Sequence, residues 1–99
     1  MVRATLTMKV QSGREEEFES AWREVAAATA KAPGNVRQTL LRSGQDASTF
    51  IITSDWATAE DFGRFERSPE QDDLTAPLRA LRESASMQVD EVVAHIDAG

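Results

Sequence analysis

Residues 49–62 read TFIITSDWATAEDF and span the junction of two expected elements. The first eight, residues 49–56, are rich in β-branched and aromatic side chains, which is typical of a central strand. Thr58 then precedes Glu60 and Asp61 in a helix-capping pattern, in which Asp61 is a weaker substitute for the usual Glu. This stretch therefore predicts a strand that turns directly into a helix.

The segment before this junction predicts a strand followed by a helix. Residues 2–10 alternate between apolar and polar side chains, which is the period of a half-buried strand. Ser12 and Glu15 then form an S-x-x-E capping box that predicts a helix start. This helix carries an apolar stripe at three- and four-residue spacing: Phe18, Ala21, Trp22, Val25 and Thr29. Pro33 and Gly34 are expected to end it.

A hairpin is the simplest connection between this helix and the junction. Residues 35–43 predict a strand of mixed pattern, and residues 44–48 contain the Gly, Asp and Ser residues that are typical of a loop. The strands on either side of the loop are therefore expected to pair in antiparallel fashion.

Two helices are expected after the junction. The helix that begins at Thr58 carries Phe62 and Phe65 on its inward face. Ser68 starts a second helix, with Pro69 in its favoured first turn. The apolar face of this second helix consists of leucines at helical spacing: Leu74, Leu78 and Leu81.

The remaining signals complete a recognisable order of elements. Pro77 predicts a kink or a break in the second of these helices, and residues 86–96 predict the last strand. The order β-α-β-β-α-β is that of the ferredoxin-like α+β fold, a four-stranded antiparallel sheet with its helices on one face. Because the other face needs a cover, we expect a homodimer in which two sheets pair face to face as a dimeric α+β barrel.

Composition narrows the classes of function. Ninety-nine residues without a repeat or a linker predict one domain over residues 1–99. Seventeen acidic against 11 basic residues give a net charge of −6, which disfavours nucleic acid as a partner. The lack of cysteine excludes disulfides and thiol chemistry, and no metal-binding or nucleotide-binding motif occurs. The alternating N-terminus predicts a cytoplasmic protein that does not span a membrane.

Several of these features together resemble the antibiotic biosynthesis monooxygenase family of dimeric α+β barrel proteins. The resemblance covers residues 3–96 and rests on these features: Gly13, Phe18, Trp22, Pro33, Gly34 and residues 55–62. It implies a homodimer with one pocket per subunit between sheet and helices. Some members use the pocket for cofactor-free oxygenation of aromatic polyketides or quinols, in which the deprotonated substrate itself donates an electron to O₂. The resemblance therefore implies a small aromatic substrate and no cofactor.

The sequence departs from the family pattern in two ways that bear on chemistry. Oxygenase-like members tend to carry an Asn earlier on the Trp-bearing strand and a Tyr in the next helix. Here the corresponding neighbourhoods contain Ile52 and Phe62, and the chain has no Tyr. Haem-degrading members combine an Asn on the first strand with a later His, and because the matching segments contain neither, that role is disfavoured.

Four aromatic side chains are candidate substrate-binding residues: Trp56, Trp22, Phe62 and Phe65. Trp56 ends its strand and is suited to wall a pocket for a planar ring system, while Trp22 faces the sheet from the first helix. The alternative for all four is ordinary core packing, because large aromatic side chains often only fill volume.

Three basic side chains are candidate catalytic residues. His95 is the only histidine, and imidazole is the usual general base at neutral pH. Arg37 or Arg42 is a candidate to stabilise an enolate or phenolate, because strands in a packed sheet normally exclude charge; Asp55 and Glu91 are acidic candidates on the same ground. The alternatives are a surface or interface histidine and charges that keep edge strands solvated.

Three functions remain open from the sequence. The first is a cofactor-independent monooxygenase acting on an aromatic polyketide or quinol-type intermediate. The second is a polyketide cyclase or aromatase of the same fold, which folds a reactive poly-β-ketone chain without using O₂. The third is a non-catalytic dimeric accessory module, which the scarcity of ionisable pocket candidates favours.

Overall fold

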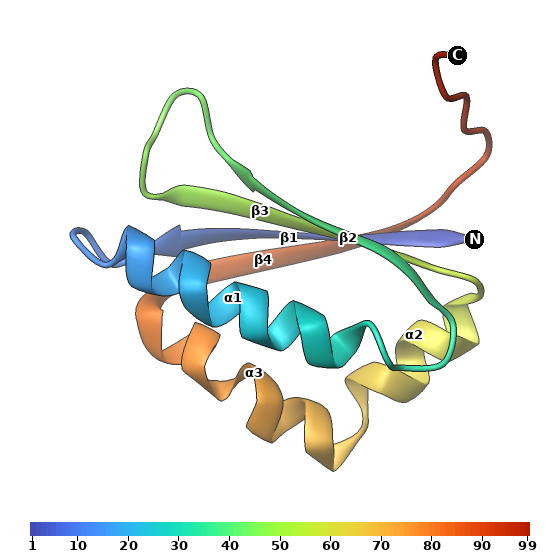
Figure 1. Ribbon diagram of the computed structural model, residues 1–99, viewed down its shortest axis with the longest axis horizontal. Coiled ribbons are helices and arrows are strands. Elements are labelled where there is room, and N and C mark those ends of the chain that lie inside the picture. Colours follow the sequence, from blue (N-terminus) through green and yellow to red (C-terminus); the bar gives the residue numbers. More distant parts are fainter.

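The computed structural model describes residues 1–99 as a four-stranded antiparallel sheet with three helices on one face (Figure 1). The elements in chain order are β1 (Val2–Val10), α1 (Glu15–Thr29), β2 (Asn35–Arg42), β3 (Thr49–Trp56), α2 (Ala59–Glu66), α3 (Pro69–Leu81) and β4 (Arg82–Glu91). The strand order across the sheet is β2-β3-β1-β4. This is the expected ferredoxin-like fold. None of the helices has the length and apolar character needed to cross a membrane.

Strand alternation divides the sheet into a helix-covered face and an open face. β1 lies at the centre and pairs with β3 on one side and β4 on the other. Ala4, Met8 and Val10 of β1 are buried on the helix-covered face, as the alternation predicts. The intervening residues lie on the open face, where Thr5 is opposite Thr53 and Gln88. One face is therefore apolar and covered, and the other is more polar.

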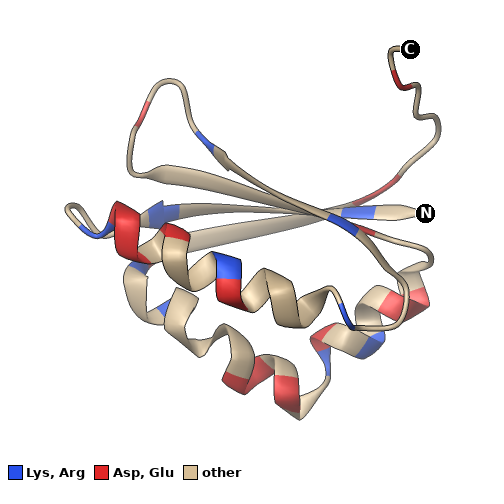
Figure 2. Ribbon diagram, in the orientation of Figure 1, with Lys and Arg blue, Asp and Glu red and all other residues tan.

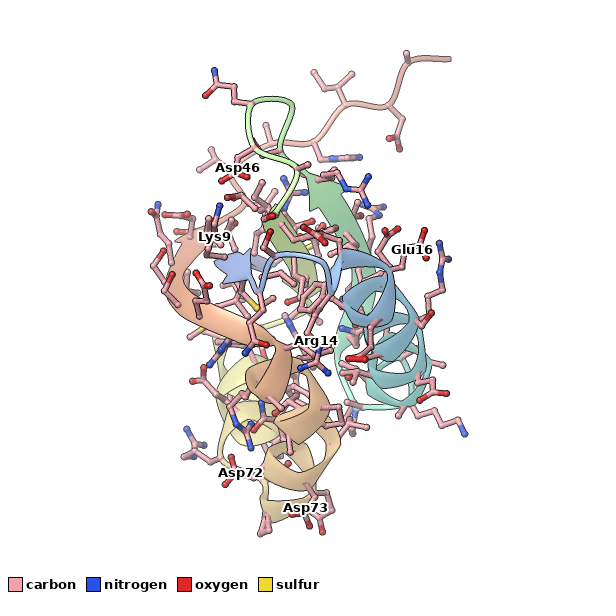
Figure 3. The ribbon with its side chains drawn as sticks, turned by 90° about the vertical axis from the view of Figure 1, so that its left-hand side faces the viewer. Lys9, Arg14, Glu16, Asp46, Asp72 and Asp73 are labelled. Atoms are coloured by element: carbon pink, nitrogen blue, oxygen red, sulfur yellow. The ribbon has the colours of Figure 1, made fainter.

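The hydrophobic core gathers near the C-terminal end of β1, which we call the packed end. Its buried members are Met8, Val10, Phe18, Val25, Phe50, Leu78 and Leu81. The rings of Phe18 and Phe50 pack with centroids 5.1 Å apart. Lys9 and Asp46 form an ion pair of 2.5 Å at the rim of this end (Figure 3).

The start of α1 differs from the prediction. The helix begins at Glu15, its N-cap residue is Arg14, and no side chain caps it. Gly13 has a left-handed φ of +88°, and the N–H of Arg14 donates to the carbonyl oxygen of Gln11 at 3.0 Å. Because this tight turn lies between Ser12 and the helix, the expected capping box is wrong. The helix also ends at Thr29, before the Pro-Gly pair.

Pro77 does not break α3, which is continuous over Pro69–Leu81. A proline removes one N–H donor from the helix, and the carbonyl left without it belongs to the residue four positions earlier, here Asp73. Pro77 and Asp73 are both exposed, so water can satisfy that carbonyl. The predicted break is therefore wrong, because the proline lies on the solvent side of the helix.

The last strand also differs from the prediction, since it covers Arg82–Glu91 and not residues 86–96. Its register with β1 begins with Arg82 opposite Val10 and ends with Glu91 opposite Val2. Because β1 begins at Val2, residues beyond Glu91 have no strand to pair with. Residues 92–99 leave the sheet as an irregular tail that extends away from the helices (Figure 1).

The turn between α1 and β2 approaches α2 closely. Gly34 has a φ of +86°, which favours glycine because the residue lacks a Cβ atom. A Cβ atom at this position would overlap the side chain of Asp61. The carbonyl oxygen of Gly34 also accepts the N–H of Ala57 at 2.8 Å. Gly34 therefore connects the start of β2 to the loop and helix that follow β3.

Candidate functional site

A hollow lies between the helix-covered face of the sheet and the three helices, toward the end opposite the packed end. We call it the chamber. Its volume is about 120 Å³. The sheet residues that border it are Ala4, Leu6, Gln38, Ile52, Ser54, Trp56 and Met87. Since an apolar cavity of roughly 150 Å³ holds one benzene molecule, the chamber has about the size of a single aromatic ring.

Aromatic side chains from two helices and one strand wall the chamber. Trp56 is 1% exposed, and its ring centroid lies 5.0 Å from that of Phe65 and 5.7 Å from that of Phe62. Its indole Nε1–H donates to Ser54 Oγ at 3.0 Å, which fixes the ring plane. Trp22 borders the chamber from α1. The structure thus brings together all four aromatic residues that the sequence singles out.

The polar groups of the chamber are almost all neutral. Gln38 is held by a hydrogen bond from its Nε2 to the carbonyl oxygen of Ala26 (2.9 Å). Gln71 and Thr75 border the chamber from α3, and Glu66 borders it from the end of α2. Glu66 is the only ionisable side chain of the lining and is exposed. Such a lining orients a ring through hydrogen bonds while keeping its surroundings apolar.

A second hollow, which we call the outer groove, lies beside the chamber and is bordered by α3 and β4. Its volume is about 340 Å³. Six residues border both spaces: Leu6, Glu66, Gln71, Thr75, Leu78 and Met87. Arg79 and Arg82 border the outer groove alone. The two spaces are therefore adjacent, with an aromatic chamber on one side and a cationic groove on the other.

Arg37 lies on the open face of the sheet. Ser54 and Trp56 border the chamber, so alternation directs the intervening Asp55 to the opposite side. Asp55 is 2% exposed and accepts hydrogen bonds from Arg3 (2.7 and 3.0 Å) and Arg37 (3.3 Å). The hydrogen bonds from Arg3 lower the pKa of Asp55, and the charges of both arginines add to this effect against the cost of burial. Arg37 is thus one partner of a buried carboxylate.

The two other basic candidates also lie outside the chamber. Arg42 pairs with Glu19 at 2.6 Å and stacks over the ring of Phe50, 5.2 Å from its centroid. His95 lies on the tail, where its Nε2 is 2.8 Å from Asp97 Oδ1. Neither residue borders the chamber or the outer groove.

Sequence reasoning missed the polar residues of α3 and β4 that border the site. Gln71, Thr75 and Leu78 follow one another at intervals of four and three residues, which is the spacing of one helix face, and Arg82 begins β4 directly after that helix. The first two interrupt an otherwise leucine-rich face. A polar residue at an inward position is a signal for a lined cavity, because a packed helix face would be apolar there.

The family assignment follows from a match over most of the chain. The family model described as antibiotic biosynthesis monooxygenase matches residues 1–76, which include all four aromatic residues of the chamber. This chain belongs to the antibiotic biosynthesis monooxygenase family. The predicted resemblance is thereby confirmed.

Solved structures of the family share the whole architecture. SnoaB, described as a cofactor-independent oxygenase from Streptomyces nogalater, is 27% identical, with a TM-score of 0.87 over 98% of this chain and 97% of its own. A Nitrosomonas europaea structure described under the family's name is 18% identical with a TM-score of 0.82, over 95% of this chain and 100% of its own. This second likeness concerns the fold alone.

Two curated Streptomyces proteins are also similar to the chain. The "42.8 kDa protein in whiE locus" of Streptomyces coelicolor is 29% identical over 99% of this chain. Protein SchA of Streptomyces halstedii is 27% identical over 78% of it. The matched regions make up 25% and 20% of these proteins, so the chain corresponds to only one part of each.

Proposed function

We propose that the protein is a cofactor-independent monooxygenase that oxidises an aromatic polyketide or quinol-type intermediate, one ring of which lies in the chamber. The observation that carries the proposal is a ring-sized hollow with aromatic walls and a single ionisable group at its border. Similarity to SnoaB along the whole chain supports the same reaction class. Trp56, Trp22, Phe62 and Phe65 are assigned to substrate binding.

The reaction needs no external reductant when the substrate is an electron-rich phenol such as an anthrone. Deprotonation gives an anion that donates an electron to O₂, and recombination forms the new C–O bond. One oxygen atom becomes the quinone carbonyl, and the other leaves as water with the two hydrogens of the methylene group. The protein stacks the ring, excludes water and orients the anion. Glu66 can accept the proton of the substrate, because it is the only ionisable side chain that borders the chamber.

Oxidation of an anthrone under air tests this function. Wild-type protein is expected to consume O₂ and form the quinone faster than buffer alone. Ile52→Phe adds a ring inside the chamber and is expected to reduce the rate at least about tenfold, because the substrate no longer fits. Val93→Phe adds the same ring on the exposed tail and serves as the matched control.

Two outcomes would contradict the proposal. One is a rate no greater than that of buffer, and the other is an unchanged rate in folded Ile52→Phe. A strictly anaerobic arm with a poly-β-ketone substrate distinguishes the cyclase alternative, since an oxygenase stalls without O₂.

We also propose that two copies of the chain pair through the open face of the sheet. The accessible surface is 6258 Å², whereas a monomer of this mass is expected to expose about 5,600 Å². The exposed tail accounts for part of this excess, and Leu41, which is 47% exposed on the open face, supports a partner there. Sedimentation is expected to give twice the mass of one chain, and Thr53→Arg at the centre of the open face is expected to halve it. A wild-type monomer would refute the pairing.

A further inference from the structure

The outer groove contains a guanidinium without a carboxylate partner. Arg82, the first residue of β4, is half-buried, and its side chain donates only to Met8 Sδ at 3.6 Å. Burial lowers the pKa of Arg82, and repulsion from Arg79 lowers it further. A partly desolvated charge with no counter-charge is unfavourable, so this arrangement favours the binding of an anion.

Arg82 is the only Lys or Arg that is both half-buried and without a carboxylate partner. Seven of the 11 Lys and Arg side chains have a carboxylate within 4.0 Å. The four without one are Arg23, Lys31, Arg67 and Arg82. The first three are exposed to water, which solvates their charge, whereas Arg82 is half-buried and its charge is only partly solvated. The missing partner is therefore significant only at Arg82.

The groups around Arg82 leave the outer groove cationic. Arg79 lies 3.8 Å from the carboxylate of Asp72, but Asp72 is largely exposed and compensates its charge weakly. Glu66 is the one carboxylate that borders the groove, and it pairs with neither arginine. Figure 2 shows that acidic residues gather on the helices of this protein of net charge −6, so a cationic groove stands out.

We propose that the outer groove binds a carboxylate carried by the aromatic substrate, with Arg82 as the residue that recognises it. The inference rests on the proposed function, because it takes one ring of the substrate to lie in the chamber. A planar guanidinium matches a carboxylate with two parallel hydrogen bonds. Because the outer groove adjoins the chamber, one fused ring system can place a ring in the chamber and its carboxylate beside Arg82. The substrate class is therefore a fused aromatic acid rather than a neutral quinol, and Arg82 determines specificity.

Intrinsic tryptophan fluorescence can test this inference directly. The chain has two tryptophans and both border the chamber, so a quinone bound there is expected to quench them. The probes are 9,10-anthraquinone-2-carboxylate and the matching 2-carboxamide, which differ only in charge. Wild-type protein is expected to bind the carboxylate at least about tenfold more tightly than the amide. Arg82→Gln is expected to remove that preference by weakening only the carboxylate, whereas Arg23→Gln, which removes an exposed charge, is expected to retain it.

The outcomes separate this inference from the function on which it rests. Equal binding of both probes by wild-type protein, or equal weakening of both by Arg82→Gln, overturns the carboxylate site and leaves the chamber as a ring-binding site. Quenching by neither probe overturns both. If Arg82→Gln does not fold, the salt dependence of wild-type binding decides, since only an ionic preference decreases at high salt.

Discussion

The packed end and the chamber end of the layer beneath the sheet contain similar side chains but differ in how completely they fill space. At the packed end Val10 and Phe18 are 0% exposed, and Phe50 is 1% exposed. At the chamber end Trp56 is equally buried, but the aromatic residues beside it are only half-buried and enclose a hollow. One layer therefore contains both a core and a candidate site.

The difference shows how a hollow forms in an apolar layer. At the packed end a large residue of α1, Phe18, contacts a large residue of β3, Phe50. At the chamber end the sheet presents the small residues Ala4 and Ser54, and the phenylalanines of α2 rest against Trp56. A hollow remains at this end because the small side chains of the sheet leave space that the phenylalanines, packed against Trp56, do not fill.

The largest expected effect comes from removing a ring at the packed end, and the removal of a ring at the chamber end is the comparison. Phe18→Ala is expected to lower the free energy of unfolding by about 3–5 kcal/mol, because it creates a new cavity in a filled core. Phe65→Ala is expected to lower it by only about 1–2 kcal/mol, since this half-buried ring already borders a hollow. Urea denaturation measures both values. Equal losses would show that the two ends are packed alike.

An intermediate effect is expected from the ion pairs, which also differ between the ends. At the chamber end Asp55→Asn is expected to lower the free energy of unfolding by about 1–3 kcal/mol at neutral pH, because Arg3 and Arg37 lose a buried acceptor. The lowered pKa of folded Asp55 means that its stabilisation is complete above the ordinary Asp pKa of about 3.9. That contribution disappears as pH falls through the lowered value.

The free energy of unfolding, measured as the pH is lowered, distinguishes Asp55 from Asp46, the paired carboxylate at the packed end. There Lys9 lowers the pKa of Asp46 to about 2, so the contribution of Asp46 is lost as pH falls from about 4 toward 2. Asp55→Asn is therefore expected to reduce the acid dependence without abolishing it. An acid profile identical to that of wild type would refute the contribution of Asp55.

The smallest expected effect concerns the helix that walls the chamber. Thr58 Oγ1 accepts the N–H of Asp61 at 3.0 Å and caps α2, so Thr58→Ala is expected to lower the free energy of unfolding by about 1 kcal/mol. Ser12→Ala is the matched control and is expected to change it by less than about 0.5 kcal/mol, because Ser12 caps no helix. A comparable loss for Ser12→Ala would show that Ser12 caps α1 in solution, in contradiction to the structure.

The fold could be predicted from the sequence because its signals are local. Alternation identifies β1, and the caps at Thr58 and Ser68 identify α2 and α3. The errors arise where the deciding partner is distant in sequence. The extent of β4 is set by the length of β1, and the tolerance of Pro77 is set by which side of α3 faces water.

The candidate site could be predicted only in part. Aromatic residues at inward positions were detectable, and all four border the chamber. Arg82 was not, because its significance lies in a missing partner that only a three-dimensional arrangement reveals. Likewise, the pairing of Arg3 and Arg37 with Asp55 depends on the register of three strands, which residue type does not reveal.

The contact between Gly34 and Asp61 limits how the family fold can change here. Any side chain at position 34 would push the first turn of α2 outward, and the phenylalanines on that helix would move with it. The distance between α2 and the sheet thus depends on the absence of a Cβ atom at Gly34, a residue that lines neither hollow. A change of substrate is accordingly easier to achieve by exchanging the residues that line the chamber than by moving α2 away from the sheet, because the contact between Gly34 and Asp61 fixes the position of that helix.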